Sequence, residues 1–259
     1  MAAALFPLAV YEDCSAYSLI TTLRWSQLRH LCIDSASISA STLINAFGNC
    51  LVLEELWMVV CPDPAPCNAP PSFITLPNLR RLTLHFIIGS NPEMFFRSLI
   101  LPQIEELNIG MIDFHTEMPG CTSLHFANMA QRSGMSRIKN LFLDKGAKPY
   151  RLADLLKYTP SLSCLDVGGD VVFDDQMLED MSTGRLGPNI EYLYLPEVED
   201  GLRILEMVWT RFHNAKKSEV SVTPIMGVKV SALVAGGDVA EVKRWVDKLR
   251  VLGVYQCPT

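Results

Sequence analysis

One short pattern recurs seven times along this 259-residue chain and constrains its fold more than any other feature. Each copy reads apolar-x-x-Leu-x-apolar, and successive copies start 25, 26, 25, 34, 24 and 28 residues apart. The copies are LRHLCI from Leu28, LEELWM from Leu53, LRRLTL from Leu79, IEELNI from Ile104, IKNLFL from Ile138, LSCLDV from Leu162 and IEYLYL from Ile190. Self-similarity at such a period indicates a repeat architecture, in which stacked copies bury one continuous core.

The pattern predicts a short β-strand in each copy, because apolar residues alternate with other residues over its last four positions. Each strand is followed by a stretch that can form a helix. These stretches are Ser41–Phe47, Pro92–Ile100, Ser123–Gln131, Tyr150–Tyr158, Gln176–Met181 and Gly201–Phe212. Proline lies two residues before four of the copies, where it ends the preceding helix without removing a central sheet hydrogen bond.

We therefore expect an α/β solenoid shaped as a horseshoe, with parallel strands on the concave side and helices on the convex side. The strands are expected to begin within about two residues of each copy's start and to lie side by side in sequence order. An ordinary doubly wound α/β domain is the alternative. It would need irregular strand spacing and glycine-rich turns after the strands, and the sequence has neither.

The two ends of the chain depart from the repeat, as capping units of repeat proteins do. Residues 1–24 are expected to form an N-terminal cap or the remnant of a preceding domain. Residues 25–259 are expected to form one repeat domain of about seven to nine repeats, with a C-terminal cap over 218–259. An eighth strand is expected at Lys217–Val222, followed by a helix at Val239–Leu249 and an edge strand at Val254–Cys257. Loops are expected at Cys61–Ser72 and Asp113–Thr122.

Composition bears on the compartment and on the class of partner. A net charge of -6 and a pI near 5.4 argue against nucleic-acid binding. The eight cysteines form no C-x-x-C pair, none of the asparagines lies in an N-x-S/T site, and no run of 18 apolar residues occurs. We predict reduced thiols, a cytoplasmic or nuclear location and no membrane contact, which disfavours a secreted or cell-surface receptor.

The seven copies resemble leucine-rich repeats, and their spacing is similar to that of the ribonuclease-inhibitor or cysteine-containing type. The ninth repeat position, often Asn or Cys in that family, matches here only at Cys61. The stretches LPNLRRLTL, LPQIEELNI, TPSLSCLDVG, GRLGPNIEYLYL and ILEMVWTRF resemble the repeat half of the large F-box proteins of mushroom-forming (basidiomycete) fungi. This resemblance covers the chain from about Trp25 to its C-terminus.

The resemblance implies that the repeats select the substrate of a cullin-type ubiquitin ligase. In that family an F-box of some forty residues precedes the repeats and docks the Skp adaptor. No F-box is seen before Trp25. The Skp adaptor and the cullin are therefore expected partners only if an F-box precedes this chain. The other interpretation is a stand-alone repeat scaffold with no role in a ligase.

The third, fifth and seventh positions of each copy are expected to point out of the concave side of the sheet. Large rings gathered there have the composition of a binding hot spot. The candidate partner-binding residues are Trp57, Arg81, His85, Glu106, Phe142, Asp166, Tyr192 and Tyr194. The alternative is that flanking loops partly cover these rings.

Catalytic and metal-binding motifs are missing from the sequence. It holds no G-x-S-x-G, Walker-type loop, H-E-x-x-H or G-x-G-x-x-G. The five histidines are scattered and no close ligand pair anchors a metal site. We therefore expect a protein-binding module with no catalytic residue, cofactor or metal. The remaining alternative is an unrecognised α/β enzyme.

Overall fold

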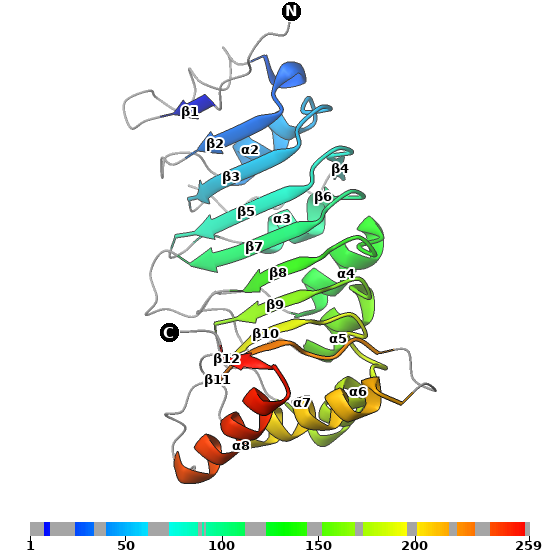
Figure 1. The fold of residues 1–259 in the computed structure, drawn as a ribbon. Coiled ribbons are helices and arrows are strands. Elements are labelled where there is room, and N and C mark those ends of the chain that lie inside the picture. Colours follow the sequence, from blue (N-terminus) through cyan, green and yellow to red (C-terminus); the bar gives the residue numbers. More distant parts are fainter. Residues whose placement is uncertain are drawn as a thin grey trace, which may run out of the picture. The chain divides into compact units, whose positions relative to one another are not determined.

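A computed structural model describes residues 8–10, 24–33, 40–61, 73–87, 90, 92–111, 123–143, 152–168, 173–195, 201–217, 222–230 and 239–256. The chain divides into two compact units, Met1–Met135 and Ser136–Thr259. Each unit contains parallel strands and helices, so both are α/β as the repeat pattern predicts (Figure 1). In the described part of the chain, none of the helices is both long and apolar enough to span a membrane.

The first unit contains a five-stranded parallel sheet whose strands follow sequence order. The strands are β1 (Leu8–Val10), β2 (His30–Ile33), β3 (Glu55–Val60), β5 (Arg81–Phe86) and β7 (Glu106–Met111). The helices are η1 (Trp25–Gln27), α2 (Ala40–Phe47), α3 (Pro92–Ser98) and α4 (Ser123–Ser133). On the helix side, β4 (Ile74–Thr75) and β6 (Leu99–Ile100) form a second, short parallel pair (Figure 1).

The second unit repeats this arrangement with another five parallel strands. They are β8 (Asn140–Leu143), β9 (Cys164–Val167), β10 (Tyr192–Leu195), β11 (Gly227–Val230) and β12 (Tyr255–Gln256). Its helices are α5 (Leu152–Tyr158), α6 (Asp175–Thr183), α7 (Gly201–Ala215) and α8 (Val239–Val251). The predicted C-terminal helix and edge strand are therefore confirmed as α8 and β12.

Each of the seven predicted strands begins two residues after the first residue of its copy, which confirms the predicted starts. Within each unit the predicted strands pair in parallel with their sequence neighbours. The first apolar residue of a copy lies before the strand and enters the core. Six of these residues are fully buried, namely Leu53, Leu79, Ile104, Ile138, Leu162 and Ile190.

A recurring backbone contact fixes the register between repeats. Where a strand begins, two successive N–H groups donate to one carbonyl of the preceding repeat. In the first unit, the N–H groups of Glu54 and Glu55 both donate to the Arg29 carbonyl, at 2.7 and 3.0 Å. In the second unit, Glu191 and Tyr192 donate in the same way to Ser163. The same contact therefore positions strands in both units and keeps equivalent residues opposite each other.

The core of the second unit holds a buried arginine that sequence reasoning did not identify. Arg211 of α7 is 0% exposed, and its guanidinium donates hydrogen bonds to the carbonyls of Met181, Gly187, Pro188 and Thr223 at 2.8–2.9 Å. Burial lowers the pKa of Arg211 to about 10, so the side chain stays charged at neutral pH. Arg211 thereby joins α7 to the end of α6 and to the segments that precede β10 and β11.

The structure corrects the predicted eighth strand. The strand that pairs with β10 is β11 at Gly227–Val230, which starts ten residues later than the predicted start at Lys217. The residues IMGVKV from Ile225 carry the repeat pattern with valine in the leucine position, and Ile225, Val228 and Val230 are buried. The interval of 35 residues from Ile190 is longer than the mean period, which explains the misplacement.

Two further elements differ from the expectation. The helix predicted over Pro92–Ile100 ends at Ser98, and Leu99–Ile100 form β6, whose Leu99 is buried. Strand β1, which pairs with β2, lies in residues 1–24, where no strand was predicted. The expected loop at Asp113–Thr122 lies outside the described residues, as does the loop at Cys61–Ser72 beyond Cys61. The predicted division into residues 1–24 and 25–259 stays a prediction.

Candidate functional site

The sheet of the first unit has one face covered by helices and one face that they leave open (Figure 1). Burial alternates along its strands, so that in β5 Leu82, Leu84 and Phe86 are buried while the residues between them are not. This confirms the predicted strand phase. We call the uncovered side the first open face; its residues are His30, Cys32, Glu55, Trp57, Arg81, Thr83, His85, Glu106 and Asn108.

Basic and acidic side chains alternate across the first open face where the strands begin. Strand register places His30, Glu55, Arg81 and Glu106 opposite one another on β2, β3, β5 and β7. His30 Nδ1 lies 3.3 Å from a Glu55 carboxylate oxygen, and the Arg81 guanidinium donates to the same carboxylate. Because such exposed pairs contribute little to stability, their main effect is to orient these side chains on the face.

A second row of alternating charge lies one residue earlier in each repeat. It consists of Arg29, Glu54, Arg80 and Glu105. The Arg29 guanidinium lies 2.8 Å from the Glu54 carboxylate, and Arg80 lies 3.8 Å from Glu105. The two rows together place a band of paired charges, with no large excess of either sign, along one end of the first open face.

Next to the charged rows lies an aromatic pair. Trp57 is half-buried, and its ring centroid is 5.6 Å from that of His85 on the neighbouring strand, with the rings tilted by 41°. Strand register places Cys32 and Thr83 on either side of Trp57. At the far end of the strands, Val59 and Gly110 are buried where the repeat position predicted them to point outward, while His85 between them stays half-buried.

The second unit has its own open face, built on the same phase. We define the second open face as Asn140, Phe142, Cys164, Asp166, Tyr192, Tyr194 and Lys229. The predicted outward residue Gly168 is buried, as are Leu165 and Val167 beneath the sheet. Register aligns Phe142, Asp166, Tyr194 and Lys229 in one row across four strands. This row combines two rings with one charge of each sign.

Tyr192 is the most exposed ring of the second open face, at 42%. Its ring lies over Gly227 of the next strand, where an added Cβ would approach Tyr192 Cδ1 to 2.7 Å. Because Gly227 has no Cβ, the Tyr192 ring can occupy this space. Sequence reasoning missed both Gly227 and Lys229 because it placed the eighth strand too early; the pattern from Ile225 was the signal that could have found them.

The eight predicted site residues divide equally between the two open faces. The first face carries Trp57, Arg81, His85 and Glu106, and the second carries Phe142, Asp166, Tyr192 and Tyr194. Phe142, Tyr194 and Trp57 are half-buried, so of the four predicted rings only Tyr192 is widely exposed. The predicted outward residues Asp34, Asp144 and Pro196 lie outside the described residues. The binding role of all eight stays a prediction.

In the part of the chain that the structure describes, Cys32, Cys50, Cys61 and Cys164 form no disulfide. Burial raises the pKa of Cys50 to about 12 and also raises the pKa of Cys61, so both stay protonated at neutral pH and are poor nucleophiles. Among the described residues, His, Cys, Asp and Glu form no group of three or more that could hold a metal ion. The open faces thus offer rings, charges and amides for contact.

Comparison of the chain with protein-family models, with curated proteins and with solved structures finds no match.

Proposed function

We propose that the chain is a non-catalytic module that binds a protein partner with the open faces of its sheets. The observation that carries this proposal is the gathering of oriented rings and paired charges on the sheet faces that the helices leave open. Side chains spread over a sheet suit an extended protein surface, whereas small metabolites are typically held in closed pockets.

The rings are already held in place, which favours binding. Trp57 packs against His85, and Tyr192 lies over Gly227. A ring with restricted motion loses less conformational entropy when a partner covers it, so more of its contact energy becomes affinity. Trp and Tyr are also the residues most enriched at the centres of protein interfaces.

We further propose that the repeats form a leucine-rich-repeat solenoid whose concave side is built from the strands. In this proposal the chain is the substrate-recognition region of an F-box-like protein in a cullin-type ubiquitin ligase. The resemblance of its repeats to those of fungal F-box proteins supports this role. The ligase partners would perform the chemistry, and the Skp adaptor would join through an F-box preceding this chain.

The binding proposal is tested by capturing partners from the source organism with the tagged chain and measuring the affinity of each purified partner by calorimetry. Trp57→Ala or Tyr194→Ala is expected to weaken binding by at least about 1–2 kcal/mol, as loss of a hot-spot ring does. The matched control is Glu179→Ala on the exposed side of α6, which should leave the affinity unchanged. Contacts that map to the helices and not to the open faces would overturn the proposal.

The ligase role has a separate test. The upstream transcript is sequenced, and the chain is compared with a version extended by any in-frame F-box for binding to the purified Skp adaptor. We expect only the extended version to bind. If no F-box lies upstream, the ligase role fails while the binding role of the open faces is unaffected.

A further inference from the structure

Aromatic rings and lysines form a cluster on α7 and α8, away from the second open face. Trp209 and Trp245 meet edge to face, with their centroids 6.1 Å apart and the rings at 75°. The His213 ring lies 4.5 Å from Trp209. Lys248 Nζ lies 4.1 Å from the centre of the Trp245 ring and 6.0 Å from that of Trp209. One ammonium group is thus held over two tryptophans from different helices.

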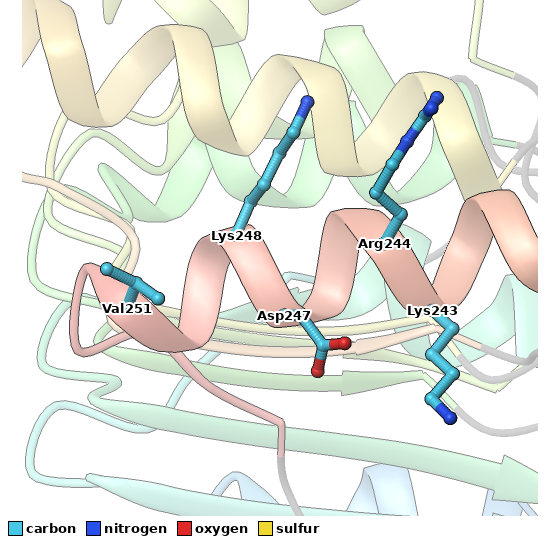
Figure 2. A pocket seen from close by; sticks show the side chains of 5 residues that line it. All are labelled: Lys243, Arg244, Asp247, Lys248 and Val251. Carbon is cyan, nitrogen blue, oxygen red and sulfur yellow. The ribbon is translucent and has the colours of Figure 1, made fainter.

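The cluster is accessible because α8 buries only one of its sides. Its inner side lies against the core, where Val246 and Leu249 share an apolar seam with Val228. Its outer side borders an open depression lined by Lys243, Arg244, Asp247, Lys248 and Val251, in which Lys248 and Arg244 extend alongside α7 (Figure 2). Val251 is 86% exposed. The two tryptophans are half-buried and His213 is exposed.

Charge distinguishes this region from the rest of an acidic chain. Residues 201–259 carry nine basic side chains, one of which is the buried Arg211, and five acidic ones, although the whole chain has a net charge of -6. The acidic residues of α8 are paired within the helix, Glu241 with Arg244 at 3.1 Å and Asp247 with Arg250 at 3.3 Å. Lys243 and Lys248 are therefore the cations of α8 left to attract an outside carboxylate.

Of these two lysines, Lys248 is the one that lies over the tryptophans. Lys243 points to the opposite side of α8, because an offset of five residues turns about 140° around a helix (Figure 2). On the end of α7, Lys216 Nζ lies 4.4 Å from the centre of the Phe212 ring. Each of these aromatic contacts restrains a flexible lysine, which lowers the entropy cost of forming an ion pair with a partner.

We infer that this surface, formed by Trp209, His213, Lys216, Trp245 and Lys248, binds an acidic segment of a protein partner. Carboxylates of the segment pair with the lysines, while its apolar side chains pack on the tryptophan edges and on Val251. The tryptophans pack against each other and against neighbouring side chains, which suits a bound peptide better than insertion into lipid. The inference does not depend on the proposed role of the open faces.

The test uses the full chain and a fluorescein-labelled peptide of four Asp-Glu-Leu repeats, with an Asn-Gln-Leu peptide of equal length as the uncharged control. Fluorescence anisotropy should show binding of the acidic peptide only, weakening at least tenfold between 50 and 500 mM NaCl. Lys248→Glu should lower the affinity at least tenfold. The matched control is Lys157→Glu, an exposed lysine of α5, which should change the affinity less than twofold.

Lys216→Glu serves as a second variant, because its side chain is exposed, lies over Phe212, and its loss leaves the tryptophan contacts intact. It should also weaken binding, with unchanged far-ultraviolet circular dichroism. Failure of the acidic peptide to bind at 50 mM NaCl would overturn the inference, as would equal losses in Lys157→Glu and Lys248→Glu. Binding to phosphatidylserine vesicles without binding to the peptide would also overturn it. Trp57→Ala should leave peptide binding unchanged, which separates this surface from the open faces.

Discussion

Leu107 and Glu106 are neighbours in β7 that face opposite sides of the sheet, and this makes them a sensitive test of strand phase. Leu107 is 0% exposed, whereas Glu106 is half-buried on the first open face. Leu107→Ala should lower the free energy of unfolding by about 2–5 kcal/mol through lost burial and a residual cavity. Glu106→Ala should lower it by less than about 0.5 kcal/mol. Chemical denaturation measures both, and equal losses would contradict the assigned phase.

Arg211 is expected to be among the most sensitive single residues of the second unit. Arg211→Met keeps much of the buried volume but removes every guanidinium donor to five carbonyls, those of Met181, Gly187, Pro188, Ile190 and Thr223. A buried acceptor left without its partner costs about 1–3 kcal/mol, so the total loss should exceed about 3 kcal/mol. Thermal or urea unfolding of the variant measures this. A loss below about 1 kcal/mol would show that water or repacking replaces the guanidinium.

At the scale of one element, α6 has well-defined ends that allow a quantitative prediction. The Asp174 carboxylate accepts a hydrogen bond from the Met177 N–H at 2.7 Å, and the helix ends at Gly184, whose φ is 77°. Asp174→Ala should lower the free energy of unfolding by about 1 kcal/mol, whereas Asp174→Asn should lower it less, because Asn also caps helices. Denaturation of the two variants side by side tests whether the cap hydrogen bond is the cause.

Elements with a strong repeat could be predicted from sequence, and elements without one could not. The seven strands were predictable because each copy has a leucine that must be buried and apolar residues that alternate along the strand. This pattern leaves only one choice of which side chains face the core. Strand β11 was misplaced because Lys217–Val222 fits the mean period, whereas the actual interval from Ile190 to Ile225 is 35 residues. Strand β6 was assigned to α3 because Leu99 and Ile100 are apolar enough to extend either element.

The open faces were predictable only in part. Period-2 alternation determines which residues of a strand face outward, so Trp57, Arg81 and Tyr192 were assigned to the correct side. How exposed each ring is depends on side chains from other repeats, such as His85 beside Trp57. The tryptophan cluster forms because α7 and α8 pack against each other. No pattern in the sequence indicates that these two helices are neighbours.

At the scale of the whole molecule, the proposed solenoid predicts how far the destabilisation caused by one substitution extends along the sheet. In a repeat array each strand is stabilised mainly by its immediate neighbours. Leu165→Ala in β9 should therefore reduce hydrogen-exchange protection most in β8, β9 and β10, and least in β12 at the end of the same sheet. Mass spectrometry of exchanged peptides measures this gradient. A uniform loss across the second unit would indicate one cooperative block and not a chain of repeats.

The alternating charges of the first unit have a consequence for how such a gene can change. Duplication or loss of a single repeat is the simplest route by which repeat arrays grow or shrink. If the repeat of β5 were lost here, Glu54 and Glu55 would lie beside Glu105 and Glu106, and carboxylates would face carboxylates. Loss of β3 and β5 together would instead leave Arg29 and His30 beside Glu105 and Glu106. The alternating charges therefore tolerate the gain or loss of two repeats together, a length twice the period that the leucines define.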